Sequence, residues 1–350
     1  MAMPHLRSAL RAYALAVLLA VSSGVVAVLV ALEFKLPLRD PDGFLGPAWV
    51  RLPVIVALFV ALDVIPRAIA GRRNVVQVLR ERYGPARSAL VVVGLGTFYM
   101  TYVAYRNLKG ALPFARPDVH DTALLQLDRT MAMGYDPSHL MHTMLGTGIA
   151  AYVLSAIYLV FLGFVPFSVV GALIWLRDVR AASWYVTALC LNWILGTVSY
   201  YLVPSLGPVF VRPGRYADLP ATGVTALQQG LAETRLEVLI NPLTAEGLAG
   251  VAGFASLHTS VVFTAALVAH RIGLPRTVRW VLWTFLALTM VATIYFGWHY
   301  IIDDIAGLAL GGSAVALAGW ASKAVDRELA RPHVLEEPQP AGVTSGVSAG

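Results

Sequence analysis

The chain has 350 residues, of which 58% are hydrophobic and only 13% are charged. A soluble globular domain carries roughly 25% charged residues, so this composition excludes an ordinary soluble protein and indicates a membrane protein. The single cysteine, Cys190, excludes an intramolecular disulfide and a cysteine-built zinc cluster. The net charge is +6, but no basic stretch is interleaved with aromatic residues, so we expect no nucleic-acid partner.

Eight apolar segments approach the roughly 20 residues that a helix needs to cross a bilayer. The first follows Arg7 and Arg11 as a signal peptide would, but it is longer than the roughly 7–15 apolar residues of such a peptide. We therefore interpret it as a retained span and predict an all-α, polytopic membrane helical bundle. The predicted spans are 12–32, 50–66, 88–106, 150–176, 182–203, 255–271, 279–297 and 299–320.

Two long connections, 107–149 and 204–254, separate these spans, and we expect a short amphipathic or re-entrant helix in each. Residues 1–87 are predicted to hold two N-terminal spans, and residues 88–322 the functional membrane domain. The segment 332–350 is rich in Pro, Gly, Ser and Val and cannot bury a core, so we predict a disordered tail.

The distribution of Lys and Arg predicts the orientation in the membrane. With a cytoplasmic N-terminus and C-terminus, 16 of the 26 Lys and Arg residues lie in the cytoplasmic segments, although the outer segments are longer. The positive-inside rule favours this orientation. The connections 107–149 and 204–254 then lie on the extracytoplasmic face, together with the start of the span at 255 and the turn at 297–299.

Two segments on that face place a histidine beside an apolar run, where an ionisable group is costly and usually functional. They are Gly253–Ser260, which contains Ser256 and His258, and Trp298–Asp304. His299 and Asp303 are four residues apart, so on a helix the carboxylate lies one turn from the imidazole. Such an Asp holds one ring N–H and leaves the other nitrogen free to attack or to move a proton. The pattern indicates phosphoryl transfer without a metal, although such a pair can also be only a satisfied polar contact.

A second group of ionisable residues lies in the outer connection. A metal site there is one interpretation, but the spacings match no standard ligand set and favour solvated loop residues. The residues are His120, His139, His142, Asp118, Asp121 and Asp128.

Three segments resemble, in order, the signatures of the type-2 phosphatidic acid phosphatase superfamily. Lys109, six residues and Arg116-Pro117 are similar to the first signature, and Ala255-Ser256-Leu257-His258 to the second. Ala292-Thr293, His299 and Asp303 are similar to the third. The Ser-Leu-His form of the second signature, the His-Tyr-x-x-Asp form of the third and the segment Tyr201–Pro208 resemble the inositolphosphotransferase branch. That branch includes fungal inositol phosphorylceramide synthase.

The resemblance implies a six-helix catalytic core and a role for each matching residue. His299 would be the nucleophile, Asp303 would orient it, and His258 would be the general acid and base. Lys109, Arg116 and Ser256 would bind the phosphate. The third signature normally carries an Arg where this chain has Thr293, so the site either works with fewer cations or recruits Arg212 and Arg215, which we prefer.

The resemblance therefore predicts an integral enzyme of the plasma (inner) membrane that needs no cofactor and no metal. It would transfer a phosphoryl or phosphoinositol group from a lipid phosphate donor to a lipid or small alcohol. With water as the acceptor, the enzyme would be a lipid or polyprenyl phosphate phosphatase. A non-catalytic lipid transporter on the same scaffold is the third hypothesis.

Overall fold

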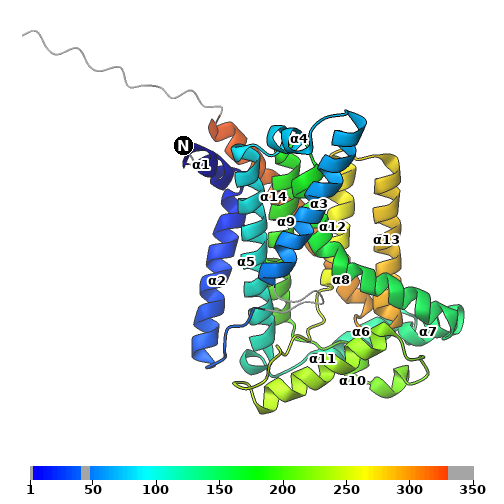
Figure 1. The fold of residues 1–350 in the computed structure, drawn as a ribbon. Helices are drawn as coiled ribbons and strands as arrows, with labels where there is room; N and C mark the ends of the chain where they lie inside the picture. The colour runs from blue at the N-terminus through cyan, green and yellow to red at the C-terminus, as the bar shows by residue number, and fades with distance from the viewer. Residues whose placement is uncertain (1–2, 41–47, 330–350) are drawn as a thin grey trace, which may run out of the picture.

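The computed structural model describes residues 3–40 and 48–329, and these residues form helices and connecting segments with no strand. Seven helices are long and apolar enough to cross a membrane, which confirms the predicted all-α polytopic bundle (Figure 1). They are α2 (Ala14–Glu33), α3 (Ala48–Ala70), α5 (Pro85–Ala115), α8 (Ile149–Trp175), α9 (Val179–Leu202), α13 (Arg276–Tyr295) and α14 (Ile301–Leu329). The predicted tail, 332–350, lies outside the described residues.

The remaining predicted span, 255–271, corresponds to the helix α12 (Leu257–Arg271), which has only 15 residues. At 1.5 Å per residue it is about 22 Å long, shorter than the hydrocarbon core of a bilayer. Its helix begins late because residues 251–256 are non-helical and end in Ser256, the N-cap. Val251, Ala255 and Ser256 of this segment are buried, so α12 begins inside the bundle.

The centre of the bundle is α9, whose residues are buried on nearly every side. It contacts α5, α14, α12, α2 and α8, and its small and apolar side chains belong to the main hydrophobic core. A helix that is apolar all round needs such a central position. The long helices that carry the candidate site therefore pack against one shared element.

Short helices gather at one end of the bundle. The connection 107–149 contains α6 (Asp121–Met131) and α7 (Pro137–Leu145), and 204–254 contains α10 (Pro208–Val211), a 3₁₀ turn at Pro213–Tyr216 and α11 (Gly223–Ile240). In Figure 1 these helices lie together, whereas α1 (Met3–Ala12) and α4 (Val75–Arg82) lie at the opposite end. The expected short helices are therefore confirmed in both connections.

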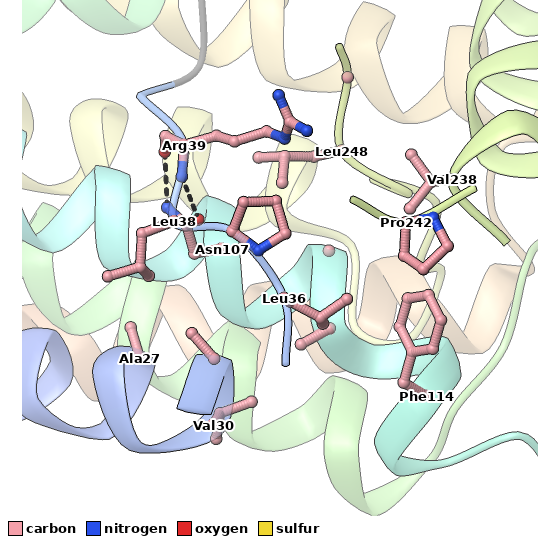
Figure 2. Close-up of a pocket in the computed structure, with 15 residues that line it drawn as sticks. Ala27, Val30, Leu36, Leu38, Arg39, Asn107, Phe114, Val238, Pro242 and Leu248 are labelled. Atoms are coloured by element: carbon pink, nitrogen blue, oxygen red, sulfur yellow. Dashed lines mark hydrogen bonds between the residues drawn. The ribbon is translucent and has the colours of Figure 1, made fainter. Parts of the chain in front are cut away.

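The C-terminal part of α5 is held by the segment that follows α2. The side chain of Asn107 donates to the carbonyl of Arg39 at 2.8 Å and accepts from its backbone N–H at 2.9 Å (Figure 2). A small cavity of about 20 Å³ lies beside this contact, between α2, α5 and the segment after α11. The contact fixes the stretch of α5 that also carries Arg106 and Lys109.

Candidate active site

His299 lies in the tight turn that joins α13 to α14. The turn depends on Gly297, whose φ of +67° is left-handed and whose missing side chain leaves room for the ring of Tyr216. The backbone N–H of Trp298 donates to the carbonyl of Thr293 at 2.8 Å, which closes the turn. His299 thus sits just before α14, with Asp303 in the first turn of that helix.

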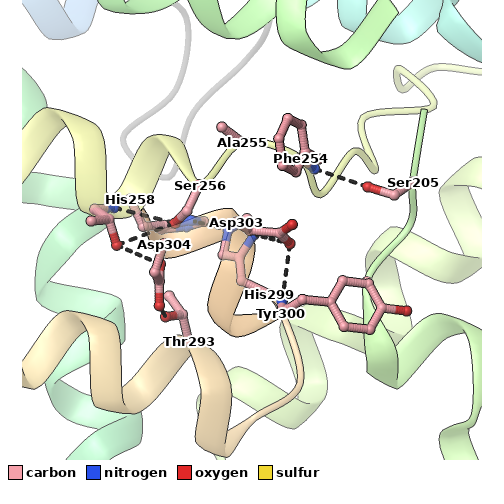
Figure 3. A network of polar contacts seen from close by, with 12 residues as sticks. Ser205, Phe254, Ala255, Ser256, His258, Thr293, His299, Tyr300, Asp303 and Asp304 are labelled. Atoms are coloured by element: carbon pink, nitrogen blue, oxygen red, sulfur yellow. Dashed lines mark hydrogen bonds and ion pairs between the residues drawn. The ribbon is translucent and has the colours of Figure 1, made fainter. Parts of the chain in front are cut away.

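Asp303 orients the imidazole of His299, as the spacing predicts. Its Oδ2 lies 3.3 Å from Nδ1 of His299 and accepts from the N–H of Tyr300 at 3.0 Å (Figure 3). Both side chains are buried. A carboxylate that accepts from Nδ1–H leaves the lone pair on Nε2, so this nitrogen is the available nucleophile.

His258 approaches His299 from the start of α12. Its Nδ1 lies 3.0 Å from Nε2 of His299, so the three side chains form one hydrogen-bonded chain. Ser256 caps the helix, because its hydroxyl accepts from the N–H of Thr259 at 3.3 Å. His258 therefore lies in the first turn of α12, beside the partial positive charge of the helix N-terminus.

Asp304 has a different role from its neighbour. One oxygen accepts from Thr259 at 2.5 Å and the other from Thr293 at 3.2 Å (Figure 3). Thr293, which occupies the position of the missing Arg, is fully buried and faces this carboxylate. It therefore joins α13 to α14 through Asp304 and does not replace a cation.

Both histidines open onto a cavity of about 210 Å³, formed by α5, α8, α9, α11, α12 and the loops around them. Lys109 and Arg106 of α5 line it as well, and no carboxylate does among the described residues. Aromatic side chains form much of its wall. The aromatic lining residues are Tyr102, Tyr105, Tyr158, Phe161, Trp193, Tyr200, Phe210 and Trp298.

The predicted phosphate-binding residues are only partly brought together. Lys109 faces the cavity, with Nζ 5.3 Å from the ring centre of Tyr200 and 5.9 Å from that of Tyr105. Arg116 is exposed and donates to the carbonyl of Tyr201 at 2.5 Å, outside the cavity lining. The hydroxyl of Ser256 is used as the cap of α12 and is fully buried.

Arg212 and Arg215 lie at a separate small pocket near the 3₁₀ turn. Arg215 forms an ion pair with Asp136, and neither Arg lines the cavity of the histidines. The structure therefore does not place them where they could replace the missing cation. The cation that it does place there, besides Lys109, is Arg106, three residues earlier on the same helix.

Two acidic residues expected in a solvated loop are instead buried in α6. Asp121 accepts from Tyr300 and from the N–H groups of Leu206 and Gly207, and Asp128 accepts from the N–H of Ile301 at 2.7 Å. The solvated interpretation was wrong for these two because α6 packs against the start of α14. Burial also raises the pKa of Asp128 to about 7. They support the turn that carries His299.

His142, a third residue of that group, is also buried and contacts the carbonyl of Tyr295 at 2.9 Å, so the solvated interpretation is wrong for it too. The remaining three, Asp118, His120 and His139, are exposed as predicted. Within residues 3–40 and 48–329, no three His, Cys, Asp or Glu side chains are grouped as metal ligands.

Comparison with known proteins identifies the family. A family model described as the PAP2 superfamily matches residues 122–317, more than half of the chain. The chain belongs to the PAP2 superfamily. A segment of 62 residues is 39% identical to the lipid A 4'-phosphatase of Porphyromonas gingivalis, and it covers 18% of this chain and 26% of that protein. No solved structure matches.

These findings confirm the superfamily that the three signatures predict, and they support a lipid phosphatase or phosphotransferase enzyme. The inositolphosphotransferase branch is not identified by them. The matched segment covers only 26% of the Porphyromonas gingivalis protein, so the match does not indicate the lipid on which this chain acts.

Proposed function

We propose that this protein is a phosphatase of membrane lipid phosphates that works through a phosphohistidine at His299. The observation that carries the proposal is the hydrogen-bonded chain Asp303–His299–His258, with separations of 3.3 and 3.0 Å, which opens onto a cavity containing Lys109. His299 supplies an oriented nucleophile, His258 supplies a proton donor, and Lys109 supplies a cation in the same cavity.

In the first step, Nε2 of His299 attacks the phosphorus atom and the bond to the lipid alkoxide breaks. His258 gives its proton to the alkoxide, and Asp303 stabilises the positive charge that develops on the ring of His299. Lys109 neutralises the phosphoryl oxygens. In the second step His258 removes a proton from water, the oxygen attacks phosphorus, and the N–P bond breaks to release phosphate.

Transfer to an alcohol is the second candidate, because aromatic side chains surround the general acid. The ring centre of His258 lies 4.5 Å from that of Phe161 and 4.9 Å from that of Tyr158. A site that limits water favours an alcohol acceptor over hydrolysis. The sequence favoured this transferase, but the lipid A 4'-phosphatase match favours hydrolysis slightly, and neither finding supports the non-catalytic transporter.

We also propose that the site faces the extracytoplasmic side of the plasma (inner) membrane, with both termini in the cytoplasm. The arginine distribution supports this orientation. A lipid head group would then reach His299 from the outer leaflet while its tails stay in the bilayer.

The test uses the purified full-length protein in nanodiscs, with a chelator present and a panel of lipid phosphates, lipid diphosphates and phosphatidylinositol. We expect turnover in the wild type and a loss of more than about 10³-fold in His299→Ala. The matched control is His270→Ala, at the exposed far end of α12. Turnover that survives in His299→Ala would refute the mechanism.

The products separate the two acceptors. Free phosphate released at the same rate with and without added alcohols identifies a phosphatase. A new phosphodiester lipid that forms only with an alcohol identifies a transferase.

A further inference from the structure

We propose that Arg106 is a substrate-binding residue whose guanidinium binds the anionic phosphate of the lipid together with Lys109. The inference rests on the proposed function and adds a cation that the three sequence signatures do not contain. It concerns the same cavity, one helical turn deeper along α5.

Arg106 lies beside Lys109 on the face of α5 that lines the cavity. Arg106 and Lys109 are three residues apart on α5, so they share one face and lie about 4.5 Å apart along the helix axis. Both line the cavity that His258 and His299 open onto. Because α5 runs toward the short helices α6 and α11, Arg106 lies on the bilayer side of Lys109.

The guanidinium of Arg106 has no anionic partner among the described residues. A guanidinium has five N–H donors, and the contact described for Arg106 is one weak hydrogen bond, 3.3 Å from Nη1 to the neutral hydroxyl of Tyr102. No carboxylate of the described residues forms an ion pair with it. A half-buried cation in a membrane bundle is costly unless an anion pairs with it, and residues 3–40 and 48–329 supply no such anion here.

The charged residues that line the cavity also favour an anionic ligand. Its lining contains two basic residues, Arg106 and Lys109, and no acidic residue among those that the structure describes, so a phosphate of charge near −2 would complement it. Lys109 is a point charge held between two tyrosine rings, whereas Arg106 can bind two phosphate oxygens at once. The pair therefore gives the site both charge neutralisation and orientation.

The experiment measures anion binding in the absence of turnover. All variants are made in the His299→Ala background, and inorganic phosphate or a short-chain alkyl phosphate is titrated in nanodiscs. The signal is tryptophan fluorescence, since Trp193 and Trp298 line the cavity. We expect Arg106→Gln to weaken binding by about 10–100-fold and Arg106→Lys by less, because Lys keeps the charge but not the fork.

The control is Arg129→Gln on α6, which does not line the cavity and should leave the affinity unchanged. Thermal unfolding of the ligand-free protein separates binding from packing. A binding role predicts that Arg106→Gln does not lower the Tm of the ligand-free protein but removes the rise in Tm that phosphate causes.

The inference would be overturned if Arg106→Gln bound phosphate as tightly as the His299→Ala protein that keeps Arg106. It would also be overturned if Arg106→Gln lowered the Tm of the ligand-free protein while phosphate still raised the Tm by the same amount. These outcomes do not depend on the phosphohistidine. If turnover survives in His299→Ala while Arg106→Gln still abolishes anion binding, the proposed function fails and the anion site stands.

Discussion

Two adjacent carboxylates in the first turn of α14 have opposite tasks. Asp303 holds the ring of His299 and the N–H of Tyr300, whereas Asp304 holds Thr259 and Thr293. On a helix, neighbouring side chains point about 100° apart, so one residue faces the histidines and the next faces the junction with α12 and α13. In the proposed mechanism Asp303 acts on the chemistry, whereas Asp304 joins α12, α13 and α14.

Asp303→Asn should lower kcat by roughly 10³–10⁴-fold with little change in Tm. The amide can present an N–H to Nδ1 and favour the tautomer that has no lone pair on Nε2. Asp304→Asn is the matched change one residue later; it should lower the Tm and leave more activity. Steady-state kinetics and thermal unfolding of both variants check this, and equal kinetic losses would contradict the division of tasks.

Asp128 makes stability depend on pH. Its pKa of about 7 lies above its value of about 4 in the unfolded chain, so between these pH values the folded protein binds more protons. Its contribution to stability is therefore present at low pH and falls as the pH rises toward 7, by at most about 1.4 kcal/mol per pH unit. Above pH 7 the contribution stays constant.

Asp128→Asn cannot ionise and keeps an oxygen that can accept from the N–H of Ile301. We expect this variant to gain stability over the wild type as the pH rises from 5 to 8. Thermal unfolding across that range measures the difference, and a constant difference would show that Asp128 does not titrate there.

Among the elements, the turn between α13 and α14 sets the place of His299. A Cβ at Gly297 would lie 2.3 Å from Cζ of Tyr216, in addition to the cost of a φ of +67°. Gly273, in the turn after α12, has a similar φ of +72° but open space around its Cα. The pair separates backbone strain from collision.

Gly297→Ala should therefore destabilise the protein by more than the roughly 1 kcal/mol expected of Gly273→Ala, and it alone should reduce kcat. Chemical or thermal unfolding and kinetics of both variants test this. Similar effects on kcat from the two substitutions would mean that the Gly297 turn does not position His299.

The long elements could be predicted from the sequence because apolar length decides them. The runs at 12–32 and 150–176 match α2 and α8 closely. The late start of α12 could not be predicted, since it depends on the Ser256 cap and on residues 251–256 remaining non-helical. The burial of Asp121 and Asp128 could not be predicted either, because α6 shields them only through its contact with α14.

The same distinction holds for the site. The spacing of His299 and Asp303 predicts their contact, since both belong to one short segment. Arg106 carries only a weak signal, a cation three residues before Lys109 at the end of a span. Which cations face a cavity is decided by how α5 packs, and the sequence does not contain that directly.

For the whole molecule, the proposed orientation in the membrane predicts which connections a soluble reagent can reach. The native Cys190 is fully buried, which shields its thiol from a soluble label, so single cysteines can be introduced elsewhere as reporters. Tyr135, 65% exposed between α6 and α7, and Val76, 52% exposed on α4, lie on opposite sides of the α5 span.

In intact cells, a membrane-impermeant maleimide should label Tyr135→Cys and should label Val76→Cys only after the membrane is opened. The reverse pattern would place the histidines on the cytoplasmic face and contradict the proposed orientation.

The most direct test of the account is to trap the covalent intermediate. A lipid phosphate labelled in its phosphoryl group is mixed with the protein in nanodiscs and quenched within milliseconds, and the protein is digested and sequenced. We predict a phosphoryl group on His299 that is stable in alkali and lost in acid, and that is absent in His299→Ala. Turnover with no protein-bound phosphoryl group, or with one on another residue, would contradict the mechanism.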